Sequence, residues 1–199
     1  MALLIELVRD PVVGIAAIAA HLDAVDAGER SAQALSLDRA DQRLLYDKAA
    51  HAPAIELAHF VGDAIGEVIH DGRNTLPLPA LLRTFQKRFC RSTDPSRVFG
   101  YNEGISRRVV GPGYFVAVPT AGRPAWTARG AIVVDYYQVP DGPVPAGWPR
   151  VVPNDHGLQR FVYRETRDFM RRVSSHVSIG AAYKAERPLD HYFVLCRRA

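Results

Sequence analysis

The sequence predicts an α+β protein, in which a helical N-terminal half packs on an antiparallel β-sheet that one C-terminal helix interrupts. Apolar residues recur at helical spacing through the first half of the chain, whereas residues 114–118 and 131–139 alternate at the period of two that marks strands. Helical spacing returns at residues 158–173. Whether the sheet closes partly or fully into a barrel is left open, because strand order cannot be derived from one sequence.

The composition is that of a single globular domain over residues 1–199, with a helical part at 1–95 and a sheet part at 96–199. At 48% hydrophobic and 23% charged residues the chain is too apolar for a disordered protein, and its apolar residues are too evenly spread for a membrane span. The net charge of +4 is modest, and only three of the 25 basic residues are lysines. So strong a bias to arginine favours genomic base composition over an anion-binding surface as its explanation.

Three helices are expected early in the chain, at residues 11–25, 38–50 and 54–62. Asp10 can cap the first of these helices, with Pro11 at the first helical position, and Asp38 can cap the second. His51, His59 and His70 follow, but no two of them have the i, i+4 spacing of a helical zinc site. We therefore expect neither a metal nor another cofactor.

A fourth helix is expected at residues 78–91. Phe85 and Phe89 would share its buried face, while Lys87 and several arginines would lie on the exposed face. The exposed face lacks the interleaved aromatic residues that single-stranded nucleic acid requires, so nucleic acid is not an expected partner.

The sheet part begins with a hairpin pattern. Residues 105–110 and 114–118 flank the turn residues 111–113, which read Gly-Pro-Gly. Arg107 and Arg108 fall on opposite faces of the first strand, so at least one arginine should emerge beside the buried face. The second strand is apolar on both faces and should be covered on both. Further strands are expected at residues 131–139, 176–184 and 191–198.

Two other features suggest pocket residues. The proline-rich residues 140–153 should form a long loop over the sheet, in which Trp148 either lines a pocket or fills one end of the core. In the strand 176–184, one face carries His176 and Ser178 beside glycine and alanine. These small residues leave room for a ligand that His176 and Ser178 could bind, or for the C-terminal helix to pack there.

A polar cluster at residues 154–157 precedes the expected helix 158–173, and Asp155 or Asn154 can cap that helix. Glu165 would lie on the apolar face of the helix, either as a buried general acid or base or as the partner of an arginine across the core. A cofactor-free active site would use His156 or His176 as its base. The groups that could orient the base are Asp155, Glu165 and Asp168, and Tyr163 or an arginine could stabilise negative charge.

No dinucleotide fingerprint, nucleophile elbow or phosphate-binding loop is present in the sequence. The favoured function is binding of a small, largely apolar ligand between the sheet and the helices, with a carboxylate or phosphate as an optional head group. Ligand-binding candidates are Arg107, Arg108, Tyr136, Trp148, His176 and Ser178. The alternative is a cofactor-free hydrolase or isomerase with a His–carboxylate pair, followed by an assembly module whose arginines meet an acidic partner or RNA.

Cys90 and Cys196 lie in apolar patterns and are expected to be buried thiols, with a disulfide as the alternative. The apolar run at residues 12–20 is too short to cross a bilayer, and a signal-peptide pattern is missing. We therefore expect a cytoplasmic protein without a membrane span. The sequence leaves homo-oligomerisation open.

Overall fold

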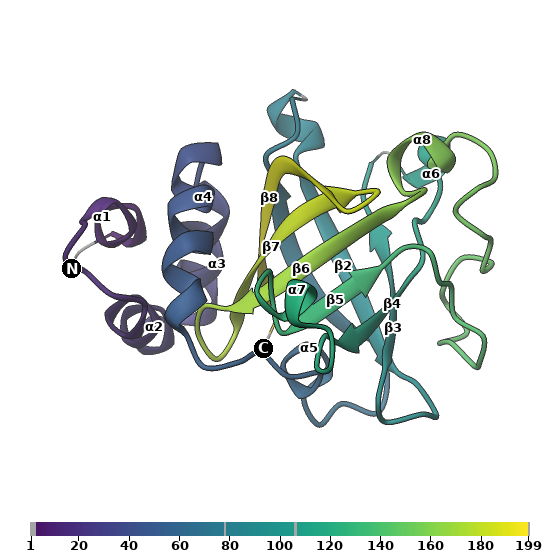
Figure 1. Cartoon of the computed structure of the whole chain (residues 1–199), viewed down its shortest axis with the longest axis horizontal. Coiled ribbons are helices and arrows are strands. Elements are labelled where there is room, and N and C mark those ends of the chain that lie inside the picture. Colours follow the sequence, from purple (N-terminus) through teal and green to yellow (C-terminus); the bar gives the residue numbers. More distant parts are fainter. Residues whose placement is uncertain (1–2, 78, 106, 199) are drawn as a thin grey trace.

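The computed structural model describes residues 3–77, 79–105 and 107–198, and within them the strands form one closed β-barrel (Figure 1). The strands are β1 (Val68–Asn74), β2 (Thr84–Arg91), β3 (Val98–Glu103), β4 (Phe115–Pro119), β5 (Ile132–Asp135), β6 (Thr166–Arg172), β7 (Val177–Lys184) and β8 (Arg187–Arg197). Each strand is antiparallel to the next along the chain, and β1 closes the barrel by pairing with β8. The predicted α+β class is confirmed, and the sheet is a closed barrel.

Four N-terminal helices lie on one side of the barrel, where the third and fourth pack against β8, the fourth also contacts β7, and the first packs on the other three (Figure 1). They are α1 (Leu4–Arg9), α2 (Ile15–Ala24), α3 (Ala27–Ser36) and α4 (Arg39–Lys48), and η1 (Ala49–His51) follows. Ile18 and Leu45 from the helices join Ile179 and Val194 from the strands in one buried cluster. None of the helices among the described residues combines the length and apolar character that a bilayer crossing requires.

The helix caps agree only in part with the sequence. Asp38 caps α4 as predicted, since its side chain accepts a hydrogen bond from the Asp41 amide at 3.0 Å. Asp10, in contrast, ends α1, and α2 begins only at Ile15. The expected helix 11–25 therefore holds only α2, which is capped by Gly14, and the helix α1 before it was not predicted.

The opposite side of the barrel is covered by the loop between β5 and α8. Its Trp148 packs on the outer face of the sheet, with ring centroids 4.9 Å from Tyr101 and 6.2 Å from Tyr114. Phe115 faces the barrel interior. Trp148 and Phe115 thus lie on opposite faces of the segment predicted as the strand 114–118. The prediction that this strand is covered on both faces is confirmed, and so is the predicted long loop over the sheet. Cys90 lies under this loop and Cys196 under the helices, both buried and free, so the predicted buried thiols are confirmed.

Two predicted helices are wrong. The segment 78–91 holds the short η2 (Ala80–Leu82) and then β2, and the segment 158–173 holds α8 (Gln159–Val162) and then β6; residue 78 lies outside the described residues. Phe85 and Phe89 are four residues apart, and residues at that spacing share a face in a strand as well as in a helix. α8 ends at Val162, and Glu165, with a positive φ of 62°, lies in the turn before β6 begins.

Other helices fall among the strands, so the helical part and the sheet part do not divide at residue 96. The segment 107–110 is the short helix α6 (Arg107–Val110) and not a strand; Ser106 lies outside the described residues. Here the chain turns away from the barrel after Gly104. The backbone N–H of Asn102 donates to the Pro112 carbonyl oxygen, beyond the end of the ladder between β3 and β4. The helix α7 (Pro124–Thr127) connects β4 to β5.

One end of the barrel is closed by α5 (Ala58–Val61) (Figure 1). Phe60 stacks on Phe89 inside the barrel with ring centroids 4.9 Å apart. The Nε2 atom of His70 lies 3.0 Å from the Phe60 carbonyl oxygen. The remaining space in the barrel therefore lies at the other end.

His70 makes this closed end sensitive to pH. Burial lowers its pKa to about 4, below the value of about 6.5 in an unfolded chain. The folded chain therefore binds fewer protons between these values, and the stabilisation is complete above pH ~6.5 and lost as pH falls toward ~4. We expect His70→Gln to lose less unfolding free energy over that range than the wild type.

Urea denaturation at several pH values measures this slope. The control is His51→Gln, since His51 is exposed at the surface. Equal slopes for His70→Gln and the wild type would contradict the role assigned to His70.

Candidate functional site

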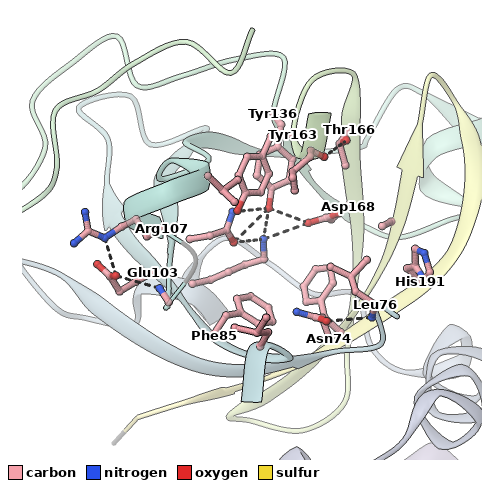
Figure 2. Close-up of a pocket in the computed structure, with 18 of the residues that line it drawn as sticks. Asn74, Leu76, Phe85, Glu103, Arg107, Tyr136, Tyr163, Thr166, Asp168 and His191 are labelled. Atoms are coloured by element: carbon pink, nitrogen blue, oxygen red, sulfur yellow. Dashed lines mark hydrogen bonds and ion pairs between the residues drawn. The ribbon is translucent and has the colours of Figure 1, made fainter. Parts of the chain in front are cut away.

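A cavity of about 410 Å³ occupies the end of the barrel opposite α5, next to α6 and α8 (Figure 2). Its walls are formed mainly by apolar side chains such as Phe85, Phe193 and Val110. At the mouth, the side chains of Ile105 and Val162 are 63% and 44% exposed. The cavity is thus open to solvent, and its volume is in the range of sites that hold small molecules.

Four polar side chains form the cavity floor: three come from β2, β3 and β6, and the fourth comes from the residue directly after β5. Lys87 Nζ donates hydrogen bonds to Asn102 Oδ1 at 3.0 Å, to Asp168 Oδ2 at 3.2 Å and to the Tyr136 hydroxyl. That hydroxyl in turn donates to Asp168 Oδ2 at 3.2 Å (Figure 2). They meet because β2, β3, β5 and β6 each direct alternate residues into the barrel.

Aromatic rings surround the charged amine of Lys87. Its Nζ atom lies 4.8 Å from the ring centroids of Phe115 and Phe193 and 5.0 Å from that of Tyr136. Tyr163 stacks on Tyr136 at 5.2 Å. The floor therefore combines a hydrogen-bonded polar group with aromatic surroundings.

Burial disfavours charge on this floor. Desolvation lowers the pKa of Lys87 and raises the pKa of Asp168, while the attraction between the two groups opposes both shifts. The pKa of Tyr136 is raised well above its usual value, chiefly by burial. The two opposite shifts bring the ion pair and the uncharged pair of Lys87 and Asp168 closer in free energy.

A second ion pair lies nearer the mouth, where Arg107 Nε contacts Glu103 Oε1 at 2.7 Å (Figure 2). Among the described residues that line the cavity, the two cations Lys87 and Arg107 are each paired with a carboxylate. His191 also lines the wall, and its buried Nδ1 has no hydrogen-bond partner within the described residues. The wall is therefore formally neutral, and one buried imidazole nitrogen on it has no partner among the described residues.

Three of the residues singled out from the sequence line this cavity: Arg107, Tyr136 and Tyr163. Asp168, considered there only as an orienting carboxylate, also belongs to its floor. Arg108 is exposed on α6 and is not among the described lining residues.

The expected histidine–carboxylate pair lies elsewhere. His156 Nδ1 and Asp155 Oδ1 are 2.5 Å apart, but their side chains are 72% and 63% exposed in the loop before α8. The side chain of Glu165 is 44% exposed, so its expected burial on an apolar helix face is wrong. The reason is that the helix 158–173 on which that burial depended does not form.

The remaining three ligand-binding candidates, Trp148, His176 and Ser178, lie in different parts of the molecule. Trp148 lies under the outer loop, where its indole N–H donates to Glu67 Oε1 at 2.6 Å. His176 lies in the β6–β7 turn, with Nδ1 3.4 Å from Arg197. Ser178 points into the closed half of the barrel, fully buried, and its hydroxyl has no partner within the part of the chain that the structure describes.

The small residues on the inner face of β7 mostly make space for neighbouring side chains and not for a ligand. Next to Gly180 the space is filled by the Phe193 ring and by the Met170 sulfur. Only Ala182 of this face lines the cavity. The alternative of a helix packed on this face is wrong, since β6 occupies that segment.

Sequence reasoning missed Lys87 and Asn102. The sequence pattern predicts Lys87 on the exposed face of a helix, whereas it lies between Phe85 and Phe89 on the inner face of β2. A lysine flanked at i−2 and i+2 by phenylalanine, in a chain with so few lysines, is the signal that could have identified it.

No three histidine, cysteine, aspartate or glutamate side chains in the described ranges are grouped so that they could hold a metal ion. Comparison of the chain with protein-family models, with curated proteins and with solved structures found no match. The function is therefore inferred from the geometry of the barrel and its cavity.

Proposed function

We propose that the protein binds a small, largely apolar molecule with an uncharged polar end in the barrel cavity. The observation that carries this proposal is an apolar, solvent-open cavity of about 410 Å³ whose floor is a buried polar cluster. Apolar walls supply the binding free energy, and the few polar groups fix the orientation of the ligand.

The charge of the wall favours an uncharged ligand. Lys87 and Arg107 are each within hydrogen-bond distance of a carboxylate, Asp168 and Glu103 respectively. A ligand carboxylate or phosphate would have to compete with these carboxylates for a cation in a desolvated space, which is costly. A carbonyl or hydroxyl group can instead bind to Tyr136, Asn102 or His191 without displacing a charge.

Titration calorimetry with three naphthalene derivatives would test the proposal. We expect naphthalenemethanol and naphthaldehyde to bind with one-to-one stoichiometry, and naphthoate to bind at least about tenfold more weakly, because its charge lacks a free cation. Equal or tighter binding of naphthoate would contradict the proposal that the polar end of the ligand is uncharged.

A substitution in the wall would locate the binding site. Ala182 lies between Asp168 and His191 in the barrel, so Ala182→Phe would place a ring over the cavity floor. We expect this variant to remain folded and to lose binding of naphthalenemethanol by more than about tenfold, while Ala121→Phe, in the exposed turn after β4, binds like the wild type. Unchanged binding by Ala182→Phe would exclude this cavity.

A further inference from the structure

We propose that Lys87 forms an imine with an apolar aldehyde or ketone bound in the cavity. This inference rests on the proposed function, because the carbonyl compound must first bind there. Lys87 contributes a primary amine, the strongest nucleophile among the described side chains that line the cavity. Its Nζ atom lies on the cavity floor, where a ligand that enters head first would place its polar group.

The reaction needs an uncharged amine, and the floor can provide one. The side chains of Lys87 and Asp168 are 2% and 7% exposed, and Nζ is 3.2 Å from Asp168 Oδ2. A proton can therefore pass from Nζ to the carboxylate and convert the ion pair into an amine and a carboxylic acid. Burial favours this uncharged pair over the separated charges.

The proposed steps balance in atoms and charge. The Nζ lone pair bonds to the carbonyl carbon, and the π electrons of the carbonyl move to its oxygen, which takes the proton of Asp168. Nζ then returns a proton to Asp168, which leaves a neutral carbinolamine. Asp168 protonates the hydroxyl group, and this group departs as water while the nitrogen lone pair forms the C=N bond. The product is an iminium cation beside the Asp168 carboxylate.

The groups around Nζ suit both the intermediate and the product. Tyr136 and Asn102 now accept hydrogen bonds from Nζ, and imine formation removes two of its hydrogens. The two side chains are then available to bind the carbinolamine oxygen and the departing water. The rings of Phe115 and Phe193, 4.8 Å from Nζ, would stabilise the iminium cation as they now stabilise the ammonium group.

A purely structural role explains the floor less well. The other inward positions near the floor, such as Phe115 and Phe193, are apolar. A buried ion pair gives no general advantage in stability over apolar side chains of similar volume. A lysine placed at the wall of an open cavity thus has a clearer explanation in ligand chemistry.

The test uses the whole wild-type protein with naphthaldehyde and cyanoborohydride, which reduces an imine to a stable amine. We expect one label per chain at Lys87, found by peptide mapping, at least about tenfold faster than at Lys48 or Lys184. Naphthalenemethanol, which binds without reacting, should slow labelling of Lys87 and leave the other lysines unaffected. Tyr136→Phe, which removes the hydroxyl group that contacts Nζ, should slow labelling at Lys87.

The outcomes separate the two proposals. If naphthalenemethanol binds but Lys87 is labelled no faster than Lys48 and Lys184, the imine is excluded and the binding function stands. If neither the alcohol nor the aldehyde binds, both proposals are wrong. Because the label is mapped on the wild-type chain, the result does not depend on whether a Lys87 variant folds.

Discussion

Replacing Lys87 with methionine is expected to lower the free energy of unfolding by about 3–5 kcal/mol near neutral pH. Methionine fills a similar volume, but Asp168 then lies buried without its cation. The carboxylate must either stay charged in an apolar environment or take up a proton, and both cost free energy. Urea denaturation of the variant and the wild type measures the loss.

A double-mutant cycle assigns this loss to the pair. Asp168→Asn removes the other charge, so the variant with both substitutions leaves no unpaired ion on the floor. We expect this double variant to recover at least about half of the stability that Lys87→Met loses, so the coupling energy, which also includes the loss caused by Asp168→Asn alone, is at least about 2 kcal/mol. If the two losses simply add, the ion pair does not stabilise the floor.

Acid should reduce the loss caused by Lys87→Met. Burial raises the pKa of Asp168, and removal of Lys87 takes away the charge that opposes this rise. A carboxyl group whose pKa is higher in the folded chain binds more protons there than in the unfolded chain, so its contribution to stability improves as pH falls. The difference between Lys87→Met and the wild type should therefore be smaller at pH ~5 than near neutrality.

Some strands could be predicted from the sequence because their pattern fits no other structure. Residues 114–118 are apolar on both faces and form a run too short for a helix, and they form β4 as expected. β2 and β6 could not be assigned in the same way. Phe85 and Phe89 fit both the helical and the strand period. Only the inward position of Lys87 between them distinguishes the strand, and a polar residue is not expected at an inward position.

The site depends on contacts that local patterns do not contain. Lys87 and Asp168 meet only because β2 and β6 face each other across a closed barrel, and the closure itself pairs Gly72 with Leu195. Tyr136 follows β5, which ends at Asp135 within the expected strand 131–139, and its side chain keeps the inward side that the alternation predicts. Tyr163 was chosen for a catalytic role on a helix that does not form, yet its ring packs against Tyr136. Its place in the cavity therefore came from the fold and not from the argument that selected it.

The second large effect is expected at Gly100, on the inner face of β3. A Cβ atom there would lie 2.6 Å from the Arg88 carbonyl oxygen of the neighbouring strand and would overlap the Phe115 ring. Backbone atoms of a paired strand cannot move without breaking the ladder between β2 and β3, in which Gly100 faces Phe89. We expect Gly100→Ala to lower the free energy of unfolding by about 3 kcal/mol, at the upper end of the cost of overpacking.

Gly147→Ala is the matched control, because a Cβ atom at Gly147 would have no neighbour within 4 Å. We expect its unfolding free energy to stay within about 0.5 kcal/mol of the wild type in urea denaturation. Since Phe115 also borders Lys87, a displaced ring at Gly100→Ala should weaken naphthalenemethanol binding as well, whereas Gly147→Ala should bind it normally. A Gly100→Ala variant as stable as Gly147→Ala would show that the barrel interior packs less tightly at this layer than the structure indicates.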